Sequence, residues 1–528
     1  MGYAEPTGAP PHVFDIAAPG RCPSHAWQVS KKKASGPLAG TLGLGLAEFD
    51  WTIHGVRHLE LFSRVTRSSL LPVALLSTAI AAGAAALHAD HGLFSSDELV
   101  ALTLSAPLND LFQHARSEDG YTVGGRLGYR DGGRDVAIDG LQIGLRGHTS
   151  IRESECAFPK LKIDFEKNGT PAQIDGTLFD GLKGIKIGTH CGESTDQTVT
   201  AKYGRLPNEQ APLREVAVYQ VLHALGVPAL KARPARISYV YTDARSGQTP
   251  DQQKPIVRNA MLLETTGATL KRLGAVSELT ETQFSNARER FSAEDTATLA
   301  FAEAMIGNFD WCMRFAPDDI YRCNQPKPLW NVLAFERGDG RTGLAIKDFD
   351  LAGTVVGGHP WFKDVFTPAF VASKSKSETE VIAQVQRTRS LFPRTQLDAE
   401  RKHLMDRKGA VYAAIDKADV DARGREIARG YVDAFYRAIA DEAYYRPVVA
   451  KESAQLFADA GGATAACGAK DLVRVGTPVN VLQKSGTMSQ VVLLDIMWRW
   501  GQADPCPAIL RGPVWIDSDA ISADYPSR

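Results

Sequence analysis

Alternation of apolar and polar residues predicts a β-rich segment that begins near residue 90. Two early runs alternate clearly and are followed by Arg-Asp-Gly-Gly, a sequence typical of a turn. A later strand pair surrounds a polar loop. The pattern thus predicts strands over residues 99–104, 121–129, 158–165, 179–187, 236–242 and 259–265.

Apolar residues at helical spacing predict four helices from residue 212 onward. The first, residues 212–226, is expected to be amphipathic and to end at Gly226, ahead of Pro228. The second follows a capping-box-like Ser292-Ala-Glu-Asp295 and spans residues 296–306. Two longer patterns, each with one packed and one solvated face, cover residues 397–416 and 420–443.

A hairpin and a distinct C-terminal region complete the predicted elements. Gly338-Asp339-Gly340 is a turn signal between residues 332–336 and a short buried strand at 344–346. A linker of small residues, 454–466, separates this part from strand-like segments at 473–482, 490–500 and 512–516.

The N-terminal part contains an apolar run, residues 70–87, preceded by basic residues and followed by small ones. This is the form of a signal peptide, which predicts a secreted or periplasmic protein. Because no Met occurs between Met1 and Met261, we expect translation to start near Val65. Residues 1–64 are then a disordered or wrongly assigned extension, and 65–89 the signal segment. The alternatives are a membrane anchor formed by residues 70–87 and a buried helix.

Charge and cysteine content narrow the class further. Sixty basic side chains balance 61 acidic ones, which argues against a general nucleic-acid-binding surface. The seven cysteines include no CxxC pair, so a zinc ribbon is disfavoured. With Cys22 set aside, proximity pairs Cys156 with Cys191, Cys312 with Cys323 and Cys467 with Cys506, although six cysteines allow fifteen connectivities.

Hard oxygen ligands gather between residues 305 and 353. They are Asp310, Asn331, Asp348 and Asp350. Carboxylates and an amide suit Mg²⁺ or Mn²⁺ better than zinc, which prefers Cys and His. The alternative is that these residues form surface turns, since Asp and Asn favour turns without any catalytic role.

Several short motifs resemble the CotH (spore-coat protein H) kinase-like family of secreted atypical protein kinases. They are Gly307-Asn-Phe-Asp310, Trp330-Asn331, Asp348-Phe-Asp350, Leu145-Arg-Gly-x-x-Ser150 and Pro159-Lys160, and they fall within residues 95–370. The resemblance implies an α+β, two-lobed atypical protein-kinase-like fold over residues 90–453.

The resemblance also implies roles for individual residues. Asp310 would be the catalytic Asp, Asn331 and Asp348 metal ligands, and Asp350 a helper at the metal. Either Lys162 or Lys160, with Arg146 nearby, would hold the phosphates of ATP. Glu215 would pair with that lysine, and Glu264 would lie at the nucleotide base. Asp310 and Asn331 are farther apart than in ordinary kinases, which a disulfide-closed insertion between Cys312 and Cys323 would explain.

Residues 467–525 loosely resemble a bacterial SH3-like β-barrel. The function expected is a secreted or periplasmic kinase that transfers a phosphoryl group from ATP with Mg²⁺ or Mn²⁺ to a protein hydroxyl. The alternative is a catalytically inactive binding protein of the cell envelope, and a metal-dependent hydrolase is a third possibility. Expected partners are a protein substrate or a cell-envelope component. We expect a monomer, no nucleic-acid partner, and membrane contact only through an uncleaved N-terminal segment.

Overall fold

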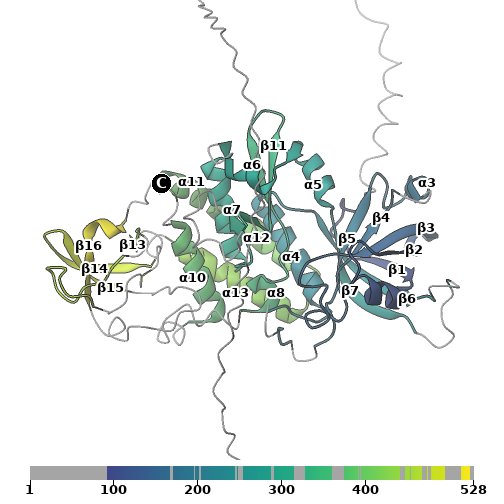
Figure 1. Ribbon diagram of the computed structural model, residues 1–528, viewed down its shortest axis with the longest axis horizontal. Helices are drawn as coiled ribbons and strands as arrows, with labels where there is room; N and C mark the ends of the chain where they lie inside the picture. The colour runs from purple at the N-terminus through teal and green to yellow at the C-terminus, as the bar shows by residue number, and fades with distance from the viewer. Residues whose placement is uncertain are drawn as a thin grey trace, which may run out of the picture. The chain divides into compact units, whose positions relative to one another are not determined.

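The computed structural model mixes helices and strands in an α+β arrangement (Figure 1). All residues that it describes belong to one of two contact-defined units, Ala79–Arg528. The predictions for residues 1–64 and 65–89 concern residues outside the described part of the chain. The described residues are 92–166, 170–194, 197–200, 204–243, 247, 254–286, 290–313, 327–359, 374–389, 392, 394–440, 446–451, 454–466, 473, 477–493 and 513–523.

Seven strands close into a barrel in the order β1-β2-β3-β4-β5-β7-β6. Strands β1 and β6 pair in parallel, and every other neighbouring pair is antiparallel. Most buried apolar positions of these strands form one core, in agreement with the predicted strands. Ala232, Met261 and Leu263 instead belong to the cluster around α4 and α7. The strands are β1 (Val100–Ala106), β2 (Thr122–Asp131), β3 (Arg134–Leu145), β4 (Leu161–Asp164), β5 (Gly184–Gly188), β6 (Ala232–Tyr241) and β7 (Ile256–Leu263).

Helix α4 (Ala211–Leu225) lies at the predicted position and ends at Gly226, whose φ of 80° needs a residue without a Cβ. The prediction of an amphipathic helix is wrong. Even Arg214 and Glu215 are buried, because α4 packs on β6 and β7, on α8 (Gly353–Val356) and on α12 (Lys408–Lys417). A helix that is covered on nearly all sides, with only His223 exposed, has no solvated face to reveal by its polarity.

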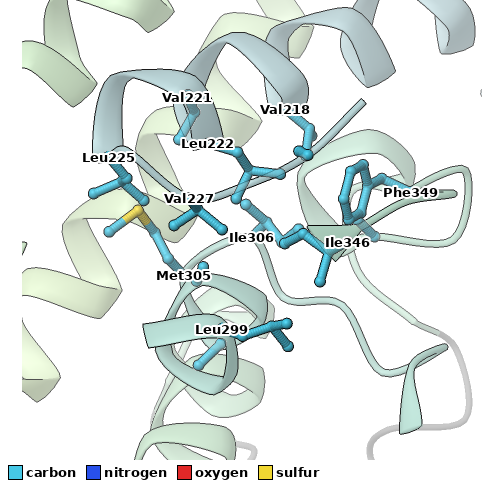
Figure 2. Close-up of a cluster of buried hydrophobic side chains, with 14 of the residues drawn as sticks. Val218, Val221, Leu222, Leu225, Val227, Leu299, Met305, Ile306, Ile346 and Phe349 are labelled. Atoms are coloured by element: carbon cyan, nitrogen blue, oxygen red, sulfur yellow. The ribbon is translucent and has the colours of Figure 1, made fainter. Parts of the chain in front are cut away.

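Helix α7 (Ala293–Met305) begins at the predicted cap, where the Ser292 side chain accepts a hydrogen bond from the amide of Asp295. Strands β11 (Val332–Arg337) and β12 (Thr342–Ile346) form the predicted hairpin, and β8 (Ala275–Glu278) extends it. Apolar side chains of α4, α7 and the end of β12 meet in one cluster (Figure 2). This cluster fixes the ends of α7 and β12 relative to α4.

The helical part differs from the sequence prediction in its boundaries. The pattern over residues 397–416 covers two helices, α11 (Arg394–Asp406) and α12, which are interrupted at Arg407. The pattern over 420–443 corresponds to α13 (Ala422–Ala438), capped by Asp421. Helix α10 (Lys376–Arg389) was not predicted, although it packs on α7 and α13. The remaining short elements before it are α2 (Leu108–His114), α3 (Thr170–Ile174), α5 (Thr266–Arg272), α6 (Glu281–Asn286), β9 (Cys312–Met313) and β10 (Leu329–Trp330).

The C-terminal strands have a small core of their own, which includes Val479, Val491 and Ile516. The structure has a three-stranded sheet, β14-β15-β16, and a separate pair, β13-β17. The elements are β13 (Val448–Val449), β14 (Val479–Ser485), β15 (Met488–Leu493), β16 (Val514–Asp517), the 3-10 helix η5 (Ser518–Ala520) and β17 (Ile521–Ser522).

Cysteine pairing and membrane spanning can be compared with the sequence predictions only in part. Cys156 and Cys191 form the predicted disulfide, with Cα atoms 4.5 Å apart. Cys312 is also disulfide-bonded. The other predicted partners, Cys323, Cys467 and Cys506, lie outside the described residues. Within the described ranges, no helix is both long and apolar enough to cross a bilayer.

Candidate active site

Two strand ends bring Asn331 and Asp348 to the same place. Asn331 lies at the start of β11 and Asp348 just beyond β12, and these two strands pair with each other. Both residues have positive φ, 55° for Asn331 and 66° for Asp348. Asn and Asp tolerate this conformation better than most residues. Such left-handed positions outside glycine are frequent at functional sites, which makes this corner a candidate.

Lys160, Asp348, Asp350 and Arg205 form what we call the ion-pair centre. The ammonium of Lys160 lies 2.9 Å from Asp348 Oδ1 and 3.0 Å from Asp350 Oδ2. Asp350 Oδ2 also accepts a hydrogen bond from Arg205 Nε at 2.9 Å. Lys160 and Asp350 are buried, whereas the side chain of Asp348 is 39% exposed. The network therefore joins the barrel, through the residue before β4, to the loop after β12.

The charges of the ion-pair centre compensate one another. Burial alone would raise the pKa of Asp350, but Lys160 and Arg205 hold that pKa well below its usual range. Burial alone would lower the pKa of Lys160, but Asp348 and Asp350 raise it. Asp350 and Lys160 are thus both charged at neutral pH, as expected for buried partners that satisfy each other.

Asp310 follows α7 and lies beside Asn331. Its Oδ1 accepts a hydrogen bond from Trp330 Nε1 at 2.9 Å, and its Oδ2 accepts one from Asn331 Nδ2 at 3.1 Å. Burial raises the pKa of Asp310 to about 7, and the negative charges of Asp348 and Asp350 contribute. A carboxyl group with a pKa near neutrality can act as a general base at physiological pH.

Of the three predicted metal ligands, Asp348 and Asp350 have carboxylate oxygens of the kind that a divalent cation prefers, whereas the amide nitrogen of Asn331 donates to Asp310. No group of three or more His, Cys, Asp or Glu side chains within the described ranges is arranged to hold a metal ion. Magnesium at nucleotide sites, however, is usually held by one or two carboxylates together with phosphate oxygens. Asp350 Oδ1 is buried and has no hydrogen-bond partner in the described structure, so it has an unused ligand position. Asp348 and Asp350 together meet this requirement.

Glu215, on α4, contacts the loop that carries Asp348 and Asp350. Its carboxylate accepts a hydrogen bond from the amide of Phe349 at 3.2 Å, and the Tyr219 hydroxyl accepts one from the amide of Asp348 at 3.1 Å. Burial raises the pKa of Glu215 above its usual value, and the positive charge of Lys160 opposes this rise. The described ion pairs do not include Glu215 with Lys160. Glu215 instead fixes the backbone between the two aspartates.

Arg146 and Lys186 form a second group of cations, which we call the basic pair. Two nitrogens of Arg146, Nε and Nη2, are buried and have no hydrogen-bond partner in the described structure. Lys186 Nζ donates to the hydroxyl of Thr266 at 3.0 Å. Burial, together with the positive charges of Arg146 and Lys347, lowers the pKa of Lys186 to about 8. Unlike Lys160, this pair has no acidic partner among the described ion pairs.

The structure separates the two lysines between which the sequence did not choose. Lys160 is buried in the ion-pair centre, whereas Lys162 is exposed on β4, opposite Gly144 on β3 and Lys186 on β5. The carboxylate of Glu264 accepts hydrogen bonds from Arg272, Thr269 and the amide of Lys231. Its predicted contact with a nucleotide base stays a prediction.

Sequence analysis missed Arg205, Trp330 and Tyr219 as site residues, and Lys186 was not among the site residues that it named. Arg205 lies in an irregular segment, and nothing in its local sequence marks it as the partner of Asp350. Trp330 did have a signal, because it precedes Asn331 in one of the recognised motifs. Lys186 lies in the strand predicted over residues 179–187, but only the structure shows that it is opposite Lys162.

The chain was compared with known proteins. No family model matches it, and no curated protein matches it.

Proposed function

We propose that this protein is a phosphotransferase that moves a phosphoryl group from ATP, bound with Mg²⁺ or Mn²⁺, to a protein hydroxyl. The observation that carries the proposal is the juxtaposition of the ion-pair centre with the basic pair. The charges of Asp310, Asp348 and Asp350 act on one another, and Asp348 also acts on Lys186. Carboxylates for a metal beside cations without acidic partners suit a metal-bound polyphosphate.

Each side chain has a role that its surroundings support. Asp310 would accept the proton of the acceptor hydroxyl, because its pKa of about 7 makes it a base at neutral pH. Asp348 and the free oxygen of Asp350 would hold the metal, with Asn331 orienting Asp310 through its amide. A bound metal ion would neutralise charge on the phosphates during transfer. Arg146 and Lys186 would hold phosphate oxygens through their unused donors.

The finer description of the fold belongs to the same proposal. The seven-stranded barrel with α4 against it would be the first lobe of an atypical kinase of the CotH type, and helices α7 to α13 the second. The three-stranded β14-β15-β16 sheet would be part of an SH3-like module. Secretion is supported by the Cys156–Cys191 disulfide, since such bonds persist in oxidising compartments.

One observation favours a second function, a binding protein without catalytic activity. Lys160 contacts carboxylate oxygens of both Asp348 and Asp350, so its ammonium already neutralises the charge that a metal would. A protein that had replaced its metal by this lysine would keep the fold and lose nucleotide binding. The two functions differ in whether Asp348 and Asp350 admit a cation.

Thermal stabilisation of the mature protein by ATP with Mn²⁺ tests the proposal. Wild type should be stabilised and Asp348→Ala should not, because Asp348 is the more exposed of the two carboxylates. Transfer of labelled phosphate to a protein acceptor should then be lost in Asp310→Asn. Absence of any stabilisation in the wild type would favour the binding protein, and phosphate release without an acceptor would favour a hydrolase.

A further inference from the structure

A buried histidine, His359, connects the loop after β12 to the helices behind it. Its Nδ1 lies 3.1 Å from Glu380 Oε2 on α10, and its backbone amide donates to Glu380 Oε1 at 2.7 Å. On the other side of the ring, Nε2 hydrogen-bonds to the carbonyl oxygen of Leu351. Leu351 directly follows Asp350 in the chain. The histidine therefore spans the distance from α10 to the backbone that carries a proposed metal ligand.

The hydrogen-bond partners of His359 define its protonation state. A carboxylate and a carbonyl oxygen can only accept, so both ring nitrogens must donate. Only the imidazolium form has two N–H groups. The negative charge that balances it is Glu380, which also accepts a hydrogen bond from the Tyr431 hydroxyl at 2.5 Å. The His359 and Glu380 side chains are each only 1% exposed, so this is an ion pair inside the protein.

The same group of residues also reaches the Asp310 loop. The ring of His359 packs edge-on against Phe309, the residue before Asp310, with centroids 5.5 Å apart. Tyr431 on α13 lies against Gly307 and Gly353, where a Cβ at either position would overlap its ring. These two glycines are themselves joined by a backbone hydrogen bond of 3.0 Å from the Gly353 amide to the Gly307 carbonyl.

We infer that His359 and Glu380 are positioning residues that hold the Asp310 loop and the Asp350 loop at a fixed separation. The inference deepens the proposed function but rests on contacts that exist whether or not the protein is active. A buried ion pair costs desolvation and is weak evidence for stability by itself. Here the His359 end contacts the Leu351 carbonyl and the Phe309 ring, which are next to Asp350 and Asp310. The Glu380 end holds the Tyr431 hydroxyl, so removal of the pair should disturb the site locally.

The charged and titratable groups around His359 agree with a protonated ring. Glu380 of α10 is the counter-ion, Tyr431 of α13 is a hydrogen-bond donor to that counter-ion, and Asp310 contributes at longer range. Although burial alone would lower the pKa of His359, Glu380 and the Leu351 carbonyl raise it. Both hydrogen bonds need a proton on the ring, and loss of either proton would remove a donor to Leu351 or to Glu380.

The test is amide hydrogen exchange of the full-length chain, measured for the wild type, His359→Gln and Glu380→Gln. Peptides that contain residues 307–310 and 348–353 should exchange on the order of tenfold faster in both variants. Peptides from β2 and β3 should not change. The matched control is Glu400→Gln, which alters another buried glutamate of the helical part, on α11, away from both loops. It should leave the two loops at the wild-type rate.

A nitrogen-15 NMR spectrum of the His359 ring gives a second readout, with both nitrogens protonated at pH 7.5. Unchanged exchange in both variants, or a neutral ring in the wild type, would overturn the inference. Faster exchange in a protein that shows no response to ATP with Mn²⁺ would support the positioning role and reject the phosphotransferase. Failure of the two proposals can thus be told apart. If Glu380→Gln does not fold, His359→Gln and the ring spectrum still decide.

Discussion

The ion-pair centre differs from Asp310 and the basic pair in whether its charges have partners of opposite sign. In the centre, Lys160 and Arg205 compensate Asp350 and lower its pKa. Among the described residues, the hydrogen-bond donors to the Asp310 carboxylate are the neutral side chains of Trp330 and Asn331, and the pKa of Asp310 rises to about 7. Arg146 and Lys186 likewise have no acidic partner among the described ion pairs. Charges that the fold compensates hold the architecture together, whereas uncompensated charges are available to a ligand.

The largest effect should come from breaking the centre itself. Lys160→Met leaves Asp350 buried with Arg205 alone, and removing one member of a buried ion pair typically costs about 3–5 kcal/mol of unfolding free energy. Urea denaturation measures this loss. The control is Lys183→Met, since Lys183 forms a pair that is exposed, with Glu166. Its midpoint should not change, and equal losses in the two variants would show that the centre is not structural.

The next largest effect should be on the rate of phosphoryl transfer when Asp310 is replaced. Asp310→Asn should lower the rate of phosphoryl transfer by about 10² to 10⁴, the usual contribution of a general base. In the wild type the rate should rise with pH through about 7, as Asp310 loses its proton. A pH–rate profile of single turnovers measures both. A rate independent of pH between 6 and 8 would contradict the role of Asp310.

Asp310 should also affect stability, with a defined sign. Because its folded pKa is raised to about 7, the folded state holds a proton that the unfolded state has released. The contribution of this group to stability is therefore present at low pH and is lost as pH rises toward 7. Asp310→Asn should flatten this decline, as measured by thermal midpoints between pH 4 and 8. A steeper decline in the variant would contradict the assignment.

Replacing Lys186 of the basic pair should have a smaller effect, which weakens nucleotide binding but increases stability. Lys186→Met should weaken binding of ATP with Mn²⁺ about tenfold, the loss expected for one charged hydrogen bond. The folded pKa of Lys186 is lowered to about 8, so its charge destabilises the fold at pH 7. The variant should therefore melt at a higher temperature than wild type. Lys162→Met, an exposed neighbour on β4, serves as the control and should change neither quantity.

The pH dependence of the Lys186→Met effect sharpens the comparison further. Between about pH 8 and the ordinary lysine value, the unfolded state binds more protons than the folded state. Stability from this group should therefore increase as pH rises through that window. The difference between wild type and Lys186→Met, measured by urea denaturation at pH 7 and pH 9.5, should shrink at the higher pH. A constant difference would mean that Lys186 does not titrate there.

Much of the fold followed from local patterns. The alternating runs predicted barrel strands, Ser292 predicted the start of α7, and Gly338–Gly340 predicted the β11–β12 hairpin. These signals are local because each depends on backbone hydrogen bonds or burial within a few residues. The amphipathic character assigned to α4 was wrong, since its packing partners come from distant parts of the chain. Helix α10 was missed because its polar positions, such as Glu380, are buried where it packs on α7 and α13.

The sequence by itself determined which residue types could form a site: the three aspartates, Asn331, and two lysines between which it could not choose. Only the tertiary structure decided that Lys160 joins Asp348 and Asp350, that Arg205 completes this group, and that Glu215 contacts the Phe349 amide instead. The physical reason is that charge compensation depends on distance in space. Lys160 and Asp348 are 188 positions apart along the chain yet form a hydrogen bond of 2.9 Å.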